Sequence, residues 1–153
     1  MSESSFIRLS LQQQADYRCL LQFDDATPPL LADEPPPLGQ NAGPSPVQLL
    51  LSAVANCLTD SLLFALRKFK QQAEPLSCRA SAEVGRNAEN RLRVLAIEVE
   101  LQLGSPAEGL EHLGRILDQF EGFCTVSQSV AGAIPIQLRV LDSQGQLLKG
   151  PKA

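Results

Sequence analysis

The side chains in this sequence best suited to chemistry are cysteine thiols, which act as nucleophiles once they lose a proton from a reference pKa of about 8.5. Two of them, Cys57 and Cys124, fall in stretches with helical patterns. Cys124 lies near a predicted helix start, where amide dipoles favour the thiolate. Cys57 falls within a long apolar helix with Asp60 one turn further on, and burial and that negative charge would both raise its pKa. The residues alone leave Cys57 open as a packed side chain or as a nucleophile assisted by Arg8, Arg18 or another arginine.

Other kinds of site find little support in the sequence. The remaining cysteines are Cys19 and Cys78, there is no CxxC pair, and His112 is the single histidine. This pattern excludes the usual zinc spacings, so we expect no bound metal or cofactor. His112 falls off the apolar stripe of its predicted helix and is expected to be solvated rather than catalytic.

Length and charge limit the class of protein. A chain of 153 residues fits one domain with a real core, which we place at 1–153. The net charge of −4 and the lack of a Lys/Arg block argue against nucleic acid as a main partner. The first residues are polar and acidic, without the apolar run of a signal peptide, so we expect a cytoplasmic protein without structural disulfides.

A long helix over residues 45–70 is the central predicted element. Ser45 is a good N-cap, and Pro46 suits the first helical position because its missing N–H would be unbonded there. The helix is apolar almost all round and is expected to be buried on most faces. Asp60 and other polar residues interrupt the apolar run and Trp is absent, so we expect no membrane span.

The segment before this helix divides into two parts. Alternating patterns at Phe6–Leu11 and Tyr17–Phe23, joined by the polar stretch Gln12–Asp16, predict a β-hairpin within residues 1–27 and place Cys19 in the core. Residues 28–44 form a proline-rich arm, and seven of the eleven prolines fall in 28–46. The arm is expected to be extended, either as a surface connector or as a stiff link that carries the hairpin onto a second subunit.

The second half mixes strands and helices. Strands are predicted at Ser77–Val84, which places Cys78 in the core, and at Arg91–Leu103. The capping box at 105–108 predicts a helix with an apolar stripe ending at Phe120, and a short second helix starts near Cys124. A strand at Ile134–Leu141 precedes a polar tail. The order ββ–α–ββ–α–α–β, with strands in clusters, predicts an α+β fold.

Two cysteine motifs and the arm resemble a known family. The run Gly43-Pro44-Ser45-Pro46-x-x-Leu49-Leu50-Leu51-Ser52-Ala53-x-Ala55-x-Cys57 resembles the signature helix of the OsmC/Ohr family of organic hydroperoxide reductases. Residues 29–39, PLLADEPPPLG, are similar to the arm of OsmC-like members. Phe123-Cys124-x-Val126 is similar to the second cysteine motif of that family. The resemblance covers about residues 17–140.

The resemblance implies a fold, a reaction and partners. It implies an intertwined α+β homodimer with antiparallel sheets around two long central helices and active sites at the subunit interface. Cys57 would be the peroxidatic cysteine, forming a sulfenic acid as it reduces an organic hydroperoxide, and Cys124 the resolving cysteine that forms a disulfide with it. An external dithiol, such as a lipoyl group, would restore the enzyme.

The sequence departs from the family's peroxidases at two places. Val47 stands where these enzymes usually carry a Glu that orients a catalytic Arg, and the Gly-Gly-Arg turn that supplies this Arg is missing. Arg18 is a loose positional match within a strand. These departures motivate an alternative, an OsmC-like stress or small-ligand-binding dimer without efficient turnover. A third possibility is that all four thiols are structural.

Overall fold

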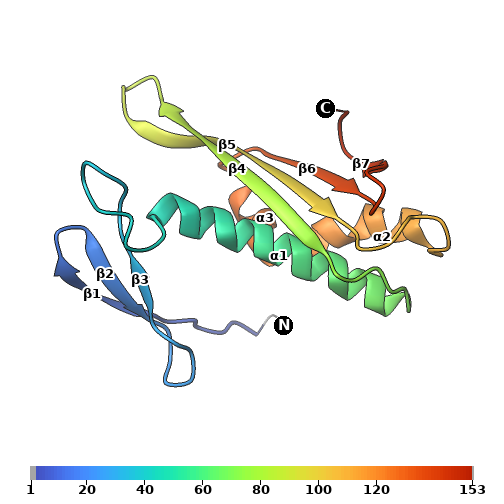
Figure 1. The fold of residues 1–153 in the computed structure, drawn as a ribbon, viewed down its shortest axis with the longest axis horizontal. Helices are drawn as coiled ribbons and strands as arrows, with labels where there is room; N and C mark the ends of the chain where they lie inside the picture. The colour runs from blue at the N-terminus through green and yellow to red at the C-terminus, as the bar shows by residue number, and fades with distance from the viewer. Residues whose placement is uncertain (1–2, 153) are drawn as a thin grey trace. The chain divides into compact units, whose positions relative to one another are not determined.

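The computed structural model describes residues 3–152, and the chain in it divides into two compact units. The first unit ends at Leu49 and the second begins at Leu50. Both are drawn in Figure 1, where the first is blue to cyan and the second runs from cyan to red.

The first unit holds a three-stranded antiparallel sheet with strand order β1-β2-β3. β1 (Ser10–Ala15) pairs with β2 (Arg18–Gln22), which pairs with the edge strand β3 (Leu30–Ala32). The predicted hairpin is present, but its first strand was placed wrongly, because residues 12–15 lie in β1 rather than in a loop. The tight turn at Asp16, with φ of 52°, sets the pairing. Every residue of β1 is exposed. The prediction relied on alternating apolar residues, but without a buried face that alternation does not determine where the strand begins and ends.

A buried carboxylate organises the proline-rich segment. Asp33 is 2% exposed, and its carboxylate accepts the N–H groups of Glu34, Gln40 and Ala42 at 2.8–3.1 Å. The Ala42 amide is the largest influence lowering the pKa of Asp33, burial works against it, and the other amides and the charge of Arg18 add to the lowering. The segment therefore turns back on itself between β3 and the helix, which differs from the extended form expected of the arm.

The predicted long helix is α1 (Pro46–Lys68). Its N-terminus is closed by a reciprocal cap, in which Ser45 Oγ accepts the Gln48 N–H at 3.2 Å and Gln48 Oε1 accepts the Ser45 N–H at 2.9 Å. Only one face of α1 is buried in the chain, so the expectation of burial on most faces is wrong for a single copy. Phe64 on the opposite side is 70% exposed. By length and composition α1 could cross a membrane, a test that core helices also pass.

The second unit is a four-stranded sheet with helices on one face. The strands are β4 (Ser77–Arg86), β5 (Leu92–Gln102), β6 (Ile136–Leu141) and β7 (Leu147–Lys149), and they follow that order across the sheet. β5 and β6 are parallel, and the other two pairs are antiparallel. The crossover between β5 and β6 carries α2 (Leu113–Gln119), the 3₁₀ turn η1 (Phe120–Phe123) and α3 (Thr125–Val130). The short β7 lies in the tail, which was predicted only to be polar.

The helix predicted to start at 105–108 does not form there, and α2 begins only at Leu113. The Ala107 N–H donates to the Asp142 carboxylate at 3.0 Å. In the predicted helix this N–H would be one of the first-turn amides that need a capping partner. Gly109 at φ 92° and His112 at φ 59° then turn the chain out of the helical region. His112 itself is exposed, as expected.

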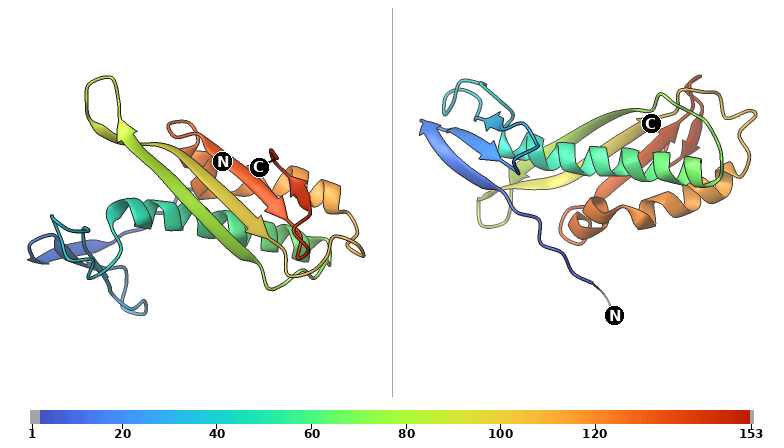
Figure 2. Two further views of the ribbon diagram at one scale, coloured as in Figure 1. Left: turned by 45° about the horizontal axis from the view of Figure 1, so that its top comes forward. Right: turned by 90° about the horizontal axis from the view of Figure 1, so that it is seen from below.

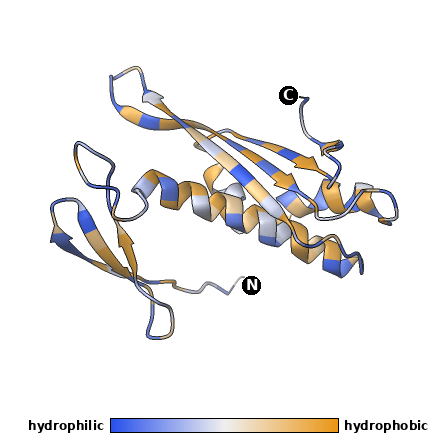
Figure 3. Cartoon of the chain, in the orientation of Figure 1, coloured by the Kyte–Doolittle hydropathy of each residue, from blue (hydrophilic) through white to orange (hydrophobic). Residues whose placement is uncertain are grey.

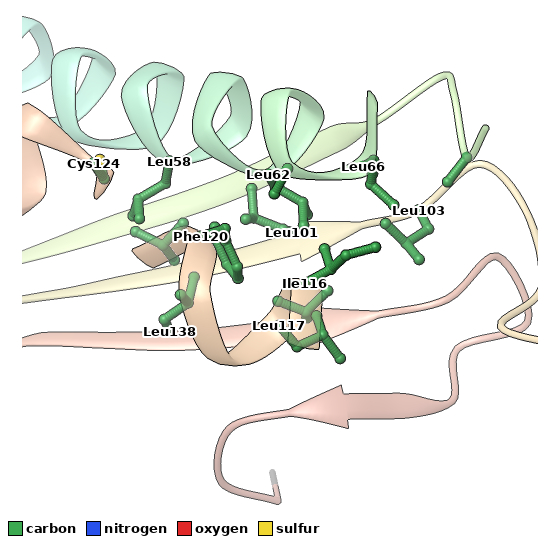
Figure 4. Packing of buried hydrophobic residues seen from close by; sticks show 14 of the residues in the cluster. Leu58, Leu62, Leu66, Leu101, Leu103, Ile116, Leu117, Phe120, Cys124 and Leu138 are labelled. Atoms are coloured by element: carbon green, nitrogen blue, oxygen red, sulfur yellow. The ribbon is translucent and has the colours of Figure 1, made fainter. Parts of the chain in front are cut away.

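The core lies between α1, the crossover helices and the inner face of the sheet (Figures 2 and 3). Figure 4 shows Leu58 and Leu62 of α1 meeting Phe120 of η1 above β5 and β6. Inward-facing residues of β5, such as Ile97 and Leu101, are 0–1% exposed, as the alternating pattern predicted. Cys124 is part of this buried cluster.

Candidate functional site

The second unit brings Cys57 and Cys124 together. Cys57 lies on α1 and is half-buried, whereas Cys124 directly precedes α3 and is 0% exposed. The two thiols lie close enough for each to influence the pKa of the other, and neither forms a disulfide. Residues far apart in the sequence thus come together as one candidate dithiol site.

The position of Cys124 depends on η1. Phe120, at the start of this turn, is 0% exposed and anchors it in the core. The Cys124 N–H donates to the Glu121 carbonyl at 3.1 Å, and its carbonyl accepts the Gln128 N–H at 3.0 Å. Lys149 of β7 contacts this segment twice. Its Nζ donates to the Leu117 carbonyl and lies 5.3 Å from the centroid of the Phe120 ring. A buried aromatic ring and a lysine therefore hold the segment that presents Cys124.

A largely apolar cavity of about 390 Å³ opens beside Cys57. It lies between α1 and the segment around η1. Asp60 and Lys68 bring one charge of each sign to its wall. Its aromatic lining consists of Phe64, Phe69, Phe120 and Phe123. Such a lining accommodates the hydrocarbon part of a small ligand, with the Cys57 sulfur available at the wall.

The surroundings of Cys57 favour its protonated form. Burial is the main cause that raises the pKa of Cys57, and the neighbouring Cys124 and the negative charge of Asp60 raise it further. The backbone amide of Val126 acts in the opposite direction and lowers the pKa of Cys57. The sequence-based expectation that burial and Asp60 work against ionisation thus agrees with the geometry.

Burial and the polar groups around Cys124 act on its pKa in opposite directions. Burial alone would raise the pKa of Cys124, but hydrogen bonds from the Ser127 hydroxyl and amide, from Cys57 and from Ser61 together outweigh it, so the pKa is lowered. The two serines were not identified from the sequence. Their spacing was the available signal, since Ser61 lies one helical turn after Cys57 and Ser127 is three residues after Cys124.

Arg18 lies on β2 of the first unit and is half-buried, where its positive charge acts on the Asp33 carboxylate. Within residues 3–152, no arginine is among the groups that shift the pKa of Cys57. A role for Arg18 toward a thiol stays a prediction. Val47 lies in the first turn of α1.

The other two cysteines, Cys78 and Cys19, have surroundings that differ from those of Cys57 and Cys124. Cys78 on β4 packs against the core cluster, where burial raises its pKa and the Thr59 hydroxyl opposes that effect. Cys19 is half-buried on β2, opposite Gln13 and Ala32. Cys78 thus has a packing role close to the one predicted.

Comparison with protein families identifies one match: the family model described as OsmC-like protein covers residues 39–139. This match contains both cysteines of the dithiol and most of the second unit. A comparison with curated protein sequences finds no match.

Solved structures share the fold. An OsmC-like protein of unknown function from Vibrio cholerae is 16% identical with a TM-score of 0.76, and the match covers 90% of this chain and 100% of that one. An organic hydroperoxide resistance protein from Elizabethkingia anophelis, with thiocyanate bound, is 16% identical with a TM-score of 0.73 and coverages of 94% and 100%. A putative organic hydroperoxide resistance protein from Vibrio cholerae, with captopril in one of its active sites, is 21% identical with a TM-score of 0.68 and coverages of 97% and 99%.

Proposed function

The chain belongs to the family of OsmC-like proteins, and on that premise we propose that it is a thiol-dependent peroxidase that reduces organic hydroperoxides. The observation that carries this proposal is that Cys57 lines an apolar cavity and has Cys124 close enough to influence its pKa. Cys57 faces the cavity and is the candidate peroxidatic thiol. Cys124 is shielded from solvent and is the candidate resolving thiol.

The reaction takes place in two steps. The Cys57 sulfur attacks the terminal oxygen of the hydroperoxide, the O–O bond breaks, and an alcohol and a Cys57 sulfenic acid result. The Cys124 sulfur then attacks the sulfenic sulfur, releasing water and forming the disulfide. Two electrons have passed from the dithiol to the peroxide, and an external dithiol of the lipoyl type returns them by thiol–disulfide exchange.

The cavity supports organic rather than inorganic peroxides as substrates. Its phenylalanine side chains offer apolar surface, whereas hydrogen peroxide has no apolar part to bury. Burial of apolar area is worth roughly 25 cal/mol per Å², so a cumyl or alkyl group gains affinity from this lining. We therefore expect cumene hydroperoxide to react faster than hydrogen peroxide at equal concentration.

The assembly we propose is a homodimer in the cytoplasm. The exposed side of α1 carries Phe64, and the first unit leaves several large apolar side chains uncovered, among them Ile7 at 97% exposure and Phe6 at 78%. A second copy of the chain would cover such surface. Sedimentation of the reduced protein should give twice the mass of the chain.

The decisive experiment measures intact mass after one equivalent of cumene hydroperoxide. The reduced protein should lose two hydrogens, and the thiols of Cys57 and Cys124 should be linked in the peptide map. Cys57→Ser should remain unchanged, while Cys78→Ser, which removes a thiol outside the site, should react as the parent does. No mass loss in the parent, or an equal loss in Cys57→Ser, would refute the proposal.

A second candidate function is a stress or ligand-binding dimer of the same fold without efficient turnover. The raised pKa of Cys57 and the absence of a neighbouring arginine within residues 3–152 favour it. Under this alternative, small apolar ligands bind the cavity, but hydroperoxide consumption with a dithiol is no faster than with the dithiol alone. Steady-state turnover with dihydrolipoamide distinguishes the two functions.

A further inference from the structure

We propose that Lys149 is a positioning residue for the resolving step: it holds the segment that presents Cys124, so that the Cys124 thiol reaches the Cys57 sulfenic acid before another reactant does. This inference rests on the proposed peroxidase function and deepens it, because it names a residue that controls one step of that reaction. Lys149 lies outside residues 39–139, the part of the chain that the family model matches. Membership of the family therefore assigns no role to Lys149.

Three groups of one segment lie around the Lys149 ammonium. Its Nζ donates to the Leu117 carbonyl at 2.6 Å, lies 3.3 Å from the Glu121 carboxylate and is 5.3 Å from the centroid of the Phe120 ring. An ammonium group has three N–H donors and no acceptor, so an oxygen atom and the face of a ring both suit it. Leu117 is in the last turn of α2, where a cation also complements the negative end of the helix. Figure 4 shows Leu117 and Phe120 on the segment that leads to Cys124.

Glu121 connects this ammonium to Cys124. The Glu121 carboxylate pairs with Lys149, while the Glu121 carbonyl accepts the backbone N–H of Cys124 and the side-chain amide of Gln128, both at 3.1 Å. Gln128 belongs to α3, the helix that follows Cys124. The chain before and after Cys124 is therefore tied to the residue with which Lys149 forms its ion pair.

The backbone of Lys149 is itself held in the sheet. Lys149 of β7 pairs with Val140 of β6. Gly150 follows with φ of 98°, and a Cβ there would fall on the Leu138 carbonyl, so glycine lets the chain pass close to β6 at this point. The Lys149 side chain is 27% exposed, so its ion pair is screened by salt less than a fully exposed pair. The ammonium thus extends from a fixed strand toward α2 and η1.

The fate of the Cys57 sulfenic acid depends on how Cys124 is held. In the resolving step the Cys124 thiol attacks the sulfenic sulfur, the disulfide forms and water leaves. A second hydroperoxide competes by oxidising the sulfenic acid to a sulfinic acid, and the hydroperoxide becomes an alcohol. The intramolecular reaction is faster only while the two sulfurs stay in place, because a misplacement of about 1 Å can cost on the order of 10²-fold in rate. Lys149 therefore acts on the use of the sulfenic acid rather than on its formation.

Trapping with dimedone, which converts a sulfenic acid to a thioether and water, measures this competition. The reduced protein receives one equivalent of cumene hydroperoxide in excess dimedone, and intact mass gives the ratio of Cys57 adduct to disulfide. Lys149→Met keeps an unbranched side chain of similar length without the ammonium, and the ratio should rise on the order of 10-fold. The ratio does not depend on how fast the sulfenic acid forms, so a slower first step cannot produce this result. Lys149→Arg, which keeps a cation able to donate to a carbonyl, should return the ratio toward the parent value.

The matched control is Arg139→Met. Arg139 of β6 forms an ion pair with Glu100 at 2.8 Å, and its side chain is 25% exposed, close to the value for Lys149. Because Arg139 lies between the buried Leu138 and Val140, it faces the other side of the sheet. This variant therefore loses an ion pair of similar burial without changing the segment before Cys124, and its adduct ratio should equal that of the parent. An equal rise in both variants would show a general loss of stability and would overturn the inference.

A second variant keeps the test available if Lys149→Met does not fold. Glu121→Gln removes the ion pair and leaves the backbone contacts of Glu121 and the Lys149–Leu117 hydrogen bond in place. Its adduct ratio should lie between those of the parent and Lys149→Met. A parent ratio in Glu121→Gln together with a parent ratio in Lys149→Arg would overturn the inference where Lys149→Met cannot be made.

Thiol labelling tests the positioning without any peroxide. Cys124 is 0% exposed, so a maleimide should reach it severalfold faster in Lys149→Met than in the parent, while Cys78 keeps its rate. Either an unchanged adduct ratio or an unchanged labelling rate of Cys124 in Lys149→Met would overturn the inference and leave the peroxidase proposal in place. If the parent forms neither disulfide nor adduct, the peroxidase proposal fails, and the role of Lys149 in the resolving step fails with it.

Discussion

Replacing Phe120 by alanine should destabilise the protein and at the same time release the turn that presents Cys124. Phe120 is 0% exposed, packs in the cluster with Leu58 and Leu138, and has the Lys149 ammonium 5.3 Å from its ring centroid. Removing a buried phenyl ring costs about 3–5 kcal/mol through lost burial and the cavity left behind. At about 2–4 °C per kcal/mol for a chain of this size, the melting temperature of the reduced protein should fall by roughly 6–20 °C.

A control for this substitution lies three residues further on in the same turn. Phe123 lines the same cavity but is 72% exposed, so Phe123→Ala should change the stability of a single chain by no more than about 0.5 kcal/mol. Urea unfolding of the reduced proteins, followed by circular dichroism, measures both values. A loss below about 1 kcal/mol for Phe120→Ala would refute the reasoning, because it would mean that the ring does not anchor η1. A loss for Phe123→Ala that depends on protein concentration would instead reveal a covering second copy.

Three further predictions concern pH, glycine and thiol access. The carboxyl pKa values of Asp33 and Asp142 are lowered, chiefly by the amides of Ala42 and Ala107 respectively, so the folded state binds fewer protons than the unfolded state. The stability that these carboxylates contribute is fully present above the unfolded-state pKa of about 3.9 and is lost as the pH falls through their lower folded-state pKa values. The urea midpoint of unfolding should therefore drop in acid, and Asp142→Asn should make it less dependent on pH. Gly39→Ala should destabilise the protein in thermal melts, because a Cβ would fall on the Glu34 carbonyl and the Asp33 carboxylate, whereas Gly114→Ala in α2 meets no atom within 4 Å and should stabilise by about 0.5–1 kcal/mol. A bulky maleimide should label Cys57 of the native reduced protein before Cys124, as peptide mapping would show, because Cys57 lines the cavity and Cys124 is 0% exposed.

The sequence pattern could predict the helices and strands whose bounds or buried faces are set by their own residues. α1 begins where Ser45 and Pro46 predicted, since capping is a local interaction. β5 has the predicted inner face, because its alternation is long and regular. The capping-box sequence at 105–108 failed because a distant carboxylate, that of Asp142, takes an amide of this segment. The start of β1 was misplaced because that strand buries neither face in the chain, so hydropathy carries no information on its bounds.

The Cys57–Cys124 site also has features that the sequence could predict locally and features that depend on distant residues. The sequence could show that Cys57 lies on an apolar helix near Asp60, and its raised pKa has those causes. The pairing with Cys124 came from the family resemblance, and in the structure each thiol is among the groups that act on the pKa of the other. Pattern could not show which polar groups act on the pKa of Cys124, because Ser61 of α1 and Ser127 of α3 come from different elements.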